Sequence, residues 1–391
     1  MKTIRAKWLR DPRLQKLFAI IAAAGGEARV AGGAVRNALM GVPVGDIDIA
    51  TSLSPQKITE IFSAEGHGVH PTGIDHGTVT VVIDRTPFEV TTLRRDVTTD
   101  GRRAVVAFTD DWAADARRRD FTINSLYCDA SGKIHYYTNG YADLLRNRVA
   151  FVGSPAARIK EDYLRILRFF RFLAQFEKLK PDAASLRACI RLKKGLQTLS
   201  AERIAQEMMK LLAGPKAVST LKLMATHNVL KNIIPHTDEF RTLARLPPDA
   251  LLRAFVLARK PELLQQAWRL SNGQAKRIAA LQEAPALSPK LRDNEQKRIL
   301  YDMGVQVWTD AVYLNRAKSR SPLNDRTWAR LLSLPGRWPI PTFPVSGRDL
   351  QDKGFVSGPD LGLELKRLEE RWAASDFKPT RDDLLNGERI G

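Results

Sequence analysis

Cysteine is scarce in this chain, which has two cysteines among 391 residues. Cys128 and Cys189 are too few for a disulfide framework or a four-cysteine zinc site. They are typical of reduced, structural cysteines, so we expect a cytoplasmic protein. No apolar run approaches the roughly 20 residues of a membrane-spanning helix, and we therefore expect no membrane segment.

Two familiar phosphate-binding signatures are also missing. The sequence contains neither G-x-G-x-x-G nor G-x-x-x-x-G-K-[ST], which excludes a dinucleotide-binding fingerprint and a Walker loop. No histidine is directly followed by aspartate, so we do not expect a histidine-aspartate metal phosphohydrolase module.

Acidic residues are the minority among the charged ones. The chain has 43 Asp and Glu against 62 Lys and Arg, a formal net charge of +19. This surplus predicts a polyanionic partner, with nucleic acid ahead of an acidic membrane surface. A generally basic proteome in the source organism is the alternative explanation.

The most informative segment joins a glycine turn, one arginine and two carboxylates. Gly32 and Gly33 let the backbone approach phosphates, and Arg36 can neutralise them. Asp46 and Asp48 share one face if they lie on a strand, and their mutual repulsion favours a divalent cation between them, Mg²⁺ above all. A lone Asp-x-Asp is more often a solvated turn, but this order predicts a nucleoside-triphosphate site.

The chain divides into a mixed first part and a helical remainder. Ser54 followed by proline is typical of a helix start. From about residue 158 strand signals nearly vanish, and proline and glycine breaks separate successive helices. Charge and glycine at 94–111 predict a loop. Strands, the last two forming a hairpin, are predicted at 28–32, 46–50, 77–84 and 87–93.

Two arginine-rich motifs follow the carboxylates. Residues 118–124 read RRDFTIN, and an arginine fork there suits phosphate oxygens. Asp162, Arg165, Arg168 and Arg171 recur at every third position, which places them on one slowly turning stripe of a single predicted helix. A surface ion-pair ladder is the alternative interpretation of this stripe.

In this order the motifs resemble those of nucleotidyltransferases with a polymerase-β-type catalytic core. The chain is similar to the class II CCA-adding tRNA nucleotidyltransferases and to bacterial poly(A) polymerases over roughly residues 28–235. The resemblance implies an α+β fold, in which an N-terminal head with a small mixed sheet precedes an elongated all-helical neck, body and tail. The implied domains are a nucleotidyltransferase catalytic head at 1–150, a helical neck with a nucleotide-selecting helix at 151–212, and a helical body and tail that bind tRNA at 213–391.

The resemblance also implies roles for individual residues. Asp46 and Asp48 would be catalytic and would hold Mg²⁺. Asp162 would accept a hydrogen bond from the exocyclic amine of C or A, and Arg165 would donate to the ring acceptor beside it; U and G present these groups in reverse order. The implied nucleotide-binding residues are Gly33, Arg36, Arg119, Asp162, Arg165, Arg168 and Arg171.

Three features around this site carry weaker expectations. Glu89 could be a third metal ligand, orient Arg94, or be an ordinary strand-face glutamate. In the family a flexible loop corresponding to 94–111 is implicated in the switch from cytidine to adenosine addition. Asn37 stands where the family usually has Asp, which removes a charge but keeps a hydrogen-bonding group.

The helical part contributes bracing and basic residues. The segment at Ser200 resembles the capped start of the family's neck helix. Ser200, together with Arg203 and Glu207 on that helix, would brace the nucleotide-selecting helix. Basic residues farther along are candidates for contacting an RNA backbone, although each is individually typical of a solvated helix face: Arg253, Arg259, Arg269, Lys276, Arg277, Lys290, Arg292, Lys297 and Arg298.

The implied activity is Mg²⁺-dependent addition or repair of the 3′-terminal CCA of tRNA from CTP and ATP, without a nucleic-acid template. The partners would be the acceptor end of tRNA and the two nucleotides, with no membrane and no obligate protein partner. A bacterial poly(A) polymerase is the alternative with the same chemistry. A noncatalytic RNA-binding protein is the third interpretation, which loss of a catalytic aspartate would favour, but both aspartates are present.

Overall fold

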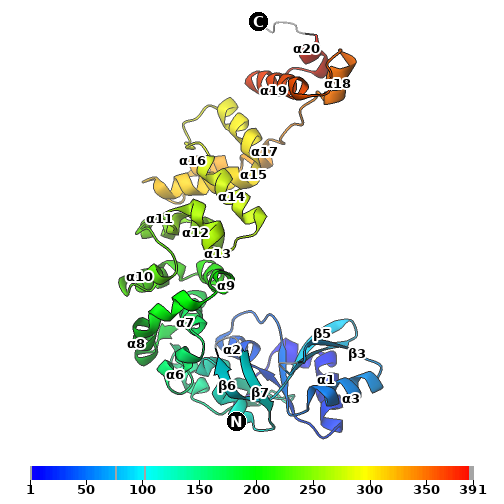
Figure 1. Ribbon diagram of the computed structural model, residues 1–391, viewed down its shortest axis with the longest axis vertical. Coiled ribbons are helices and arrows are strands. Elements are labelled where there is room, and N and C mark those ends of the chain that lie inside the picture. Colours follow the sequence, from blue (N-terminus) through cyan, green and yellow to red (C-terminus); the bar gives the residue numbers. More distant parts are fainter. Residues whose placement is uncertain (1, 75–76, 101–102, 387–391) are drawn as a thin grey trace. The chain divides into compact units, whose positions relative to one another are not determined.

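The computed structural model describes residues 2–74, 77–100 and 103–386 (Figure 1). Contacts divide the chain into two units, Met1–Ile234 and Pro235–Gly391. The first unit combines a sheet with helices, and the second consists mainly of helices, so the predicted α+β class is confirmed. None of the described helices is both long and apolar enough to cross a bilayer. The finer boundaries near residues 150 and 212 stay predictions.

The first unit is built around a mixed seven-stranded sheet with strand order β3-β4-β5-β2-β1-β8-β9. All four predicted strands are present within a few residues of their expected ends. β4 and β5 form the predicted hairpin, and the φ angles of 46° and 64° at Asp84 and Arg85 fit a type I′ turn. The strands are β1 (Ala28–Ala31), β2 (Asp48–Thr51), β3 (Gly68–Gly73), β4 (Thr78–Ile83), β5 (Thr86–Thr92), β8 (Leu126–Cys128) and β9 (Ile134–Tyr136).

The prediction of a loop at 94–111 is wrong for most of this segment. β6 (Arg94–Asp100) and β7 (Arg103–Phe108) pair as an antiparallel hairpin with a register shift between Asp96 and Thr98. Valine in both strands and threonine in β6 favour extended backbone, and the ladder satisfies the backbone groups that a loop would expose to water. Residues 101 and 102 lie outside the described part of the chain.

Helices surround the sheet and continue beyond it. Ser54 caps α3 as predicted, because its side chain accepts a hydrogen bond from the backbone N–H of Lys57 at 3.2 Å. The helices of this unit are α1 (Pro12–Ala23), α2 (Gly33–Met40), α3 (Pro55–Ala64), α4 (Trp112–Arg118), α5 (Gly140–Leu145), α6 (Pro155–Glu161), α7 (Leu164–Gln175), α8 (Ala183–Leu192), α9 (Ala201–Leu212) and α10 (Ala217–Thr226). Short 3₁₀ segments are η1 (Lys7–Arg10), η3 (Thr122–Asn124), η4 (Lys193–Thr198) and η5 (Leu230–Asn232), and β10 (Arg148–Val149) pairs with β11 (Lys180–Pro181).

The single helix predicted to carry Asp162 and the three arginines is broken. α6 ends at Glu161, and Asp162 has extended backbone with φ −158° and ψ 110° before α7 begins. The carboxylate of Asp162 accepts the backbone N–H of Leu164 at 3.0 Å, which satisfies a donor at the start of α7. The stripe therefore comprises three arginines on α7, and Asp162 lies at its entrance.

A phenylalanine cluster joins the RRDFTIN segment to α7. The ring of Phe121 lies 4.7 Å from that of Phe151 and 5.3 Å from that of Phe172, measured between centroids. Phe121 and Phe169 are fully buried. This apolar contact fixes the segment that carries Arg119 relative to α7, so the phosphate-binding and base-selecting candidates share one core.

The second unit consists of helices, and its C-terminal end has a small core of its own. α15 contains one non-helical residue, Gly304, with φ 72°. The terminal core comprises Val345, Leu350, Leu368, Trp372 and Leu384. The helices are α11 (Phe240–Arg245), α12 (Ala250–Leu257), η6 (Pro261–Leu263), α13 (Leu264–Trp268), α14 (Asn272–Glu283), α15 (Asp293–Lys318), α16 (Arg326–Leu332), α17 (Leu334–Arg337), α18 (Gly347–Asp352), α19 (Pro359–Ala374) and α20 (Arg381–Leu385).

Candidate active site

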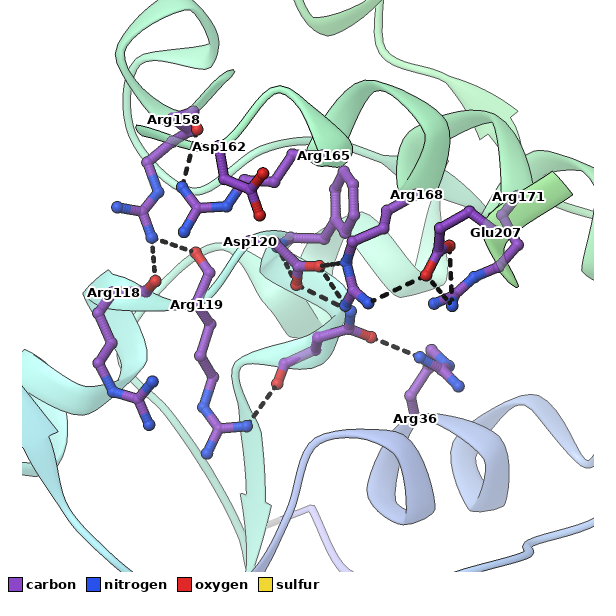
Figure 2. A network of polar contacts seen from close by, with 12 residues as sticks. Arg36, Arg118, Arg119, Asp120, Arg158, Asp162, Arg165, Arg168, Arg171 and Glu207 are labelled. Carbon is purple, nitrogen blue, oxygen red and sulfur yellow. Dashed lines mark hydrogen bonds and ion pairs between the residues drawn. The ribbon is translucent and has the colours of Figure 1, made fainter. Parts of the chain in front are cut away.

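A polar cleft of about 790 Å³ in the first unit gathers the predicted site residues. The sequence places them on separate segments, but the fold brings all of them to one surface. The cleft-lining residues that the sequence singled out as site residues are Gly33, Arg36, Asp46, Asp48, Arg119, Asp162, Arg165, Arg168 and Arg171. Figure 2 shows the hydrogen bonds and ion pairs that connect arginines of this cleft with their acceptor groups.

The two carboxylates lie at the entry to β2. Asp48 is the first residue of the strand and Asp46 precedes it, so the expectation that both lie on the strand is wrong. Both side chains are exposed to the cleft, while Ile49 is buried beneath them. Although Asp48 faces the cleft, the protein around it replaces part of its water, and this desolvation raises its pKa; the charge of Arg119 opposes the rise and that of Asp46 adds to it. A cation between the carboxylates would relieve this penalty.

Glu89 lies opposite Asp48 in the register between the parallel strands β2 and β5. Among the described residues, no group of three or more His, Cys, Asp or Glu is arranged to hold a metal ion. Asp46 and Asp48 line the cleft, as do Asp120 and Asp162. The metal-binding role of Asp46 and Asp48 and both expected functions of Glu89 stay predictions.

Arg36 projects from α2, directly after the glycine turn. Its guanidinium lies 5.0 Å and 4.8 Å from the ring centroids of Phe172 and Phe176 and donates to the side chains of Asn37 and Asn124. Burial lowers its pKa to about 10, and the charge of nearby Arg171 contributes. The side-chain amide of Asn37 also donates to a backbone carbonyl at 2.9 Å, a contact that a carboxylate could not make.

Arg119 is held by a buried group that sequence reasoning missed. Its guanidinium donates to the Asp115 carboxylate at 3.0 Å and to the Tyr127 hydroxyl at 3.2 Å. Gly32 gives it room, since a Cβ there would lie 3.1 Å from Arg119 Nη1. Asp115 precedes Arg118 by three positions and Arg119 by four, a helical spacing typical of ion pairs that could have revealed it.

Asp120 is a hub between the RRDFTIN segment and α7. Its carboxylate accepts from Arg168 Nε at 2.7 Å and from the Asn124 side chain at 3.1 Å. Burial would raise the pKa of Asp120, but the charge of Arg168 and the hydrogen bonds from Asn124 and Arg168 together hold the pKa below its ordinary value. The hydrogen bond between Asn124 and Asp120 therefore holds this segment together.

Asp162 and Arg165 line the same cleft but do not pair with each other. Arg203 on α9 donates to Asp162 at 2.7 Å. Arg165 donates to the carboxylate of Glu161 and to the backbone carbonyl of Arg158 at 2.8 Å. Figure 2 shows both side chains at the junction of α6 and α7. Their direct contact with a base stays a prediction.

The predicted bracing by α9 is confirmed for its two charged residues. Glu207 is 4% exposed and accepts from Arg171 at 3.0 Å, while Arg203 reaches Asp162. Ser200 stands at the N-cap of α9, but its side chain makes no capping hydrogen bond, so that part of the expectation is wrong.

Further cleft residues were not predicted from the sequence. Phe172, Gln175 and Lys210 also line it, and an isolated phenylalanine, glutamine or lysine in a helix carries no signal that separates it from core or solvent positions. Of the basic residues expected to contact RNA, Arg253 is buried, and Arg277 is partly exposed and forms ion pairs with Asp249 and Asp310.

Comparison with known proteins identifies the family. Residues 28–150 match the family described as poly A polymerase head domain, and residues 178–241 match the probable RNA and SrmB- binding site of polymerase A. The CCA tRNA nucleotidyltransferase 1, mitochondrial, of Mus musculus is 35% identical, with 97% of this chain and 92% of that protein covered. The CCA-adding enzyme of Streptococcus gordonii is 34% identical, with 89% and 90% covered.

Solved structures agree with this result. The crystal structure of Bacillus stearothermophilus CCA-adding enzyme in complex with CTP matches with a TM-score of 0.79 and 27% identity over 93% of each chain. The chain therefore belongs to the family of class II CCA-adding enzymes and bacterial poly(A) polymerases. It is a nucleotidyltransferase.

Proposed function

We propose that this protein is a CCA tRNA nucleotidyltransferase that adds or repairs the 3′-terminal CCA of tRNA from CTP and ATP. One observation carries the proposal: the two carboxylates, the phosphate-binding arginines and the pair Asp162 and Arg165 all line one cleft. The similar proteins named as CCA-adding enzymes support CCA addition over poly(A) addition. The proposed domains are the head at 1–150, the neck at 151–212 and the tRNA-binding body and tail at 213–391.

Metal-dependent transfer is general in this family, and the donor set of this chain fits a hard divalent ion. Asp46 and Asp48 would hold Mg²⁺, which supplies a lowered pKa for the tRNA 3′-hydroxyl and a positive charge beside the pyrophosphate leaving group. Gly33 lets the backbone of α2 approach the phosphates, and Arg36 and Arg119 neutralise their charge.

The base would be chosen at the junction of α6 and α7. The Asp162 carboxylate accepts from the exocyclic amine of C or A, and Arg165 donates to the ring nitrogen beside it. A base that presents these groups in reverse order leaves buried polar atoms unpaired, which costs about 1–3 kcal/mol each. Arg168 and Arg171, held by Asp120 and Glu207, keep α7 in place and add positive charge to the cleft.

An extension assay on tRNA that lacks its CCA end tests the proposal. With Mg²⁺ and CTP alone we expect addition of two cytidines, and with CTP and ATP a complete CCA end. A poly(A) polymerase would ignore CTP and add many adenosines with ATP. Asp46→Ala should abolish extension and leave tRNA binding intact, whereas Asp110→Ala, at an exposed position, serves as the matched control. Extension by Asp46→Ala would contradict the metal assignment.

A further inference from the structure

We propose that Asp115 is a positioning residue for the incoming nucleotide, because its carboxylate holds the guanidinium groups of Arg118 and Arg119 where they face the triphosphate. The inference rests on the proposed function and deepens it. Asp115 itself is 1% exposed, whereas both arginines line the cleft, so Asp115 acts through them.

The contacts divide the carboxylate between the two arginines. Oδ1 accepts from Arg118 Nε at 2.8 Å, and Oδ2 accepts from Arg119 Nη2 at 3.0 Å. The Tyr127 hydroxyl donates to Oδ2 at 2.6 Å and accepts from Arg119 Nε at 3.2 Å. Each guanidinium is thereby held on its buried side by a hydrogen bond to a carboxylate, and hydrogen bonds between charged groups are stronger than those between neutral groups.

The charge balance suits a phosphate ligand. Burial would raise the pKa of Asp115, but the charges of Arg119 and Arg118 outweigh it and lower the pKa to about 2, so the group remains a carboxylate. One negative charge against two positive ones leaves a net positive charge at the cleft surface. A positive charge whose geometry is fixed before binding attracts phosphate without a reorganisation cost.

The same carboxylate also reaches the β6–β7 hairpin. The backbone N–H of Arg94, the first residue of β6, donates to Asp115 Oδ1 at 3.4 Å. Asp115 thus connects the start of this hairpin with the two arginines. A purely structural role, anchoring α4 beside the sheet, would explain these contacts equally well, so the test needs a measurement that depends on the phosphates.

The measurement is the affinity of the full-length protein for CTP and for CMP, by calorimetry with Mg²⁺. Asp115→Asn keeps the shape of the side chain but removes its charge and turns an amide N–H donor toward one of the donor groups that surround it. We expect a roughly tenfold to hundredfold loss of CTP affinity and little change in CMP affinity. Asp111→Asn is the control, since Asp111 is on the exposed end of α4 and asparagine caps a helix equally well.

Each possible result of this experiment either supports or overturns the positioning role. Equal losses for CTP and CMP, or an unchanged CTP affinity, would overturn the positioning role. A wild-type protein that binds no CTP would contradict the proposed function, and the inference with it. If Asp115→Asn does not fold, Tyr127→Phe replaces it, because it removes one hydrogen bond from each of Asp115 and Arg119; a smaller CTP-specific loss supports the inference, and a loss shared by CMP overturns it.

Discussion

An arginine keeps a fixed position in a cleft only where acceptors surround its guanidinium. At the scale of single residues, each cleft arginine here has such a partner. Arg36 has the amide oxygens of Asn37 and Asn124, and its guanidinium also stacks near two phenylalanine rings. The other arginines that line the cleft form ion pairs, which are Arg118 and Arg119 with Asp115, Arg165 with Glu161, Arg168 with Asp120, Arg171 with Glu207, and Arg203 with Asp162. The positive charge of the cleft is therefore arranged before any nucleotide arrives.

The raised pKa of Asp48 predicts how activity depends on pH. Cation binding needs the deprotonated carboxylate, so turnover should fall as the pH drops through this raised pKa. Because Mg²⁺ competes with the proton, a higher Mg²⁺ concentration should move the acidic limb of the pH profile of kcat/KM to lower pH. An acidic limb that is indifferent to Mg²⁺ would contradict the role of Asp48.

The raised pKa of Asp48 also predicts how the stability of the metal-free protein depends on pH. A folded-state pKa above the unfolded value means that the folded protein binds the proton more tightly, so the contribution of Asp48 is favourable at low pH and is lost as the pH rises. Asp48→Asn should therefore raise Tm at neutral pH and have little effect at acidic pH. Thermal unfolding at two pH values in a chelator measures this.

At the scale of elements, the packing of α9 against α7 decides where the cleft residues lie. The interface is predominantly apolar but contains the buried pair of Arg171 and Glu207, and Arg203 reaches from α9 to Asp162 at the break before α7. The break itself lets Asp162 face the cleft from a different backbone direction than the three arginines.

Removing Glu207 should destabilise this interface strongly. Glu207→Ala leaves Arg171 buried without its carboxylate, and breaking a buried pair on one side costs about 3–5 kcal/mol of the free energy of unfolding. Denaturant unfolding followed by circular dichroism measures the loss. Glu60→Ala is the control, because Glu60 pairs with Lys57 on the surface of α3 and should matter far less. Similar losses for both variants would refute the role of burial.

Two glycines near the chain's end should respond to alanine in opposite directions. A Cβ at Gly362 or Gly354 would meet no atom within 4 Å, but Gly354 has φ 96° whereas Gly362 lies within helix α19. Gly362→Ala should stabilise α19 by up to about 1 kcal/mol, and Gly354→Ala should destabilise its turn by about 1–2 kcal/mol. Hydrogen exchange of peptides from α18 and α19 reads both; changes of the same sign would contradict this backbone argument.

At the scale of the whole molecule, charge is the dominant feature. The net charge of the chain is +19, which is far more than the positive charge that remains in the cleft once its arginines are paired with carboxylates. Many of the basic residues belong to the helical second unit. Some of them are structural, as Arg253 and Arg277 show, so the charge that remains for RNA is smaller than the composition suggests.

Salt should therefore weaken tRNA binding steeply. Release of counterions from the RNA backbone makes log K fall linearly with log[salt], and we expect a loss of at least about tenfold between 50 and 200 mM salt. Fluorescence anisotropy of labelled tRNA gives the slope. CTP binding in the same salt series is the internal comparison and should fall less, because CTP offers fewer phosphates. A tRNA affinity that ignores salt would contradict electrostatic binding.

The sequence predicted the residues that line the cleft better than the buried residues that hold them in position. Gly33, Arg36, Asp46 and Asp48 lie in one short segment, so their association needs little of the fold. Tyr127 was missed because a strand tyrosine looks like an ordinary sheet residue until the fold brings it to Arg119. The spacing of Asp115 to Arg118 and Arg119 did carry a signal, but only the fold shows that this carboxylate is buried. The hairpin at β6 and β7 was missed because its charges suggested solvent exposure.

The sequence by itself determined the order of a mixed and a helical part, four of the seven strands of the sheet and the residue types that can hold a cation and phosphates. These follow from local periodicity and from side-chain chemistry. Only the tertiary structure decided which acceptor holds each arginine, and that Asp162 leaves the helix to face the cleft. Such contacts join residues far apart in the chain, such as Arg203 and Asp162, and depend on how whole elements pack and which charges they bury together.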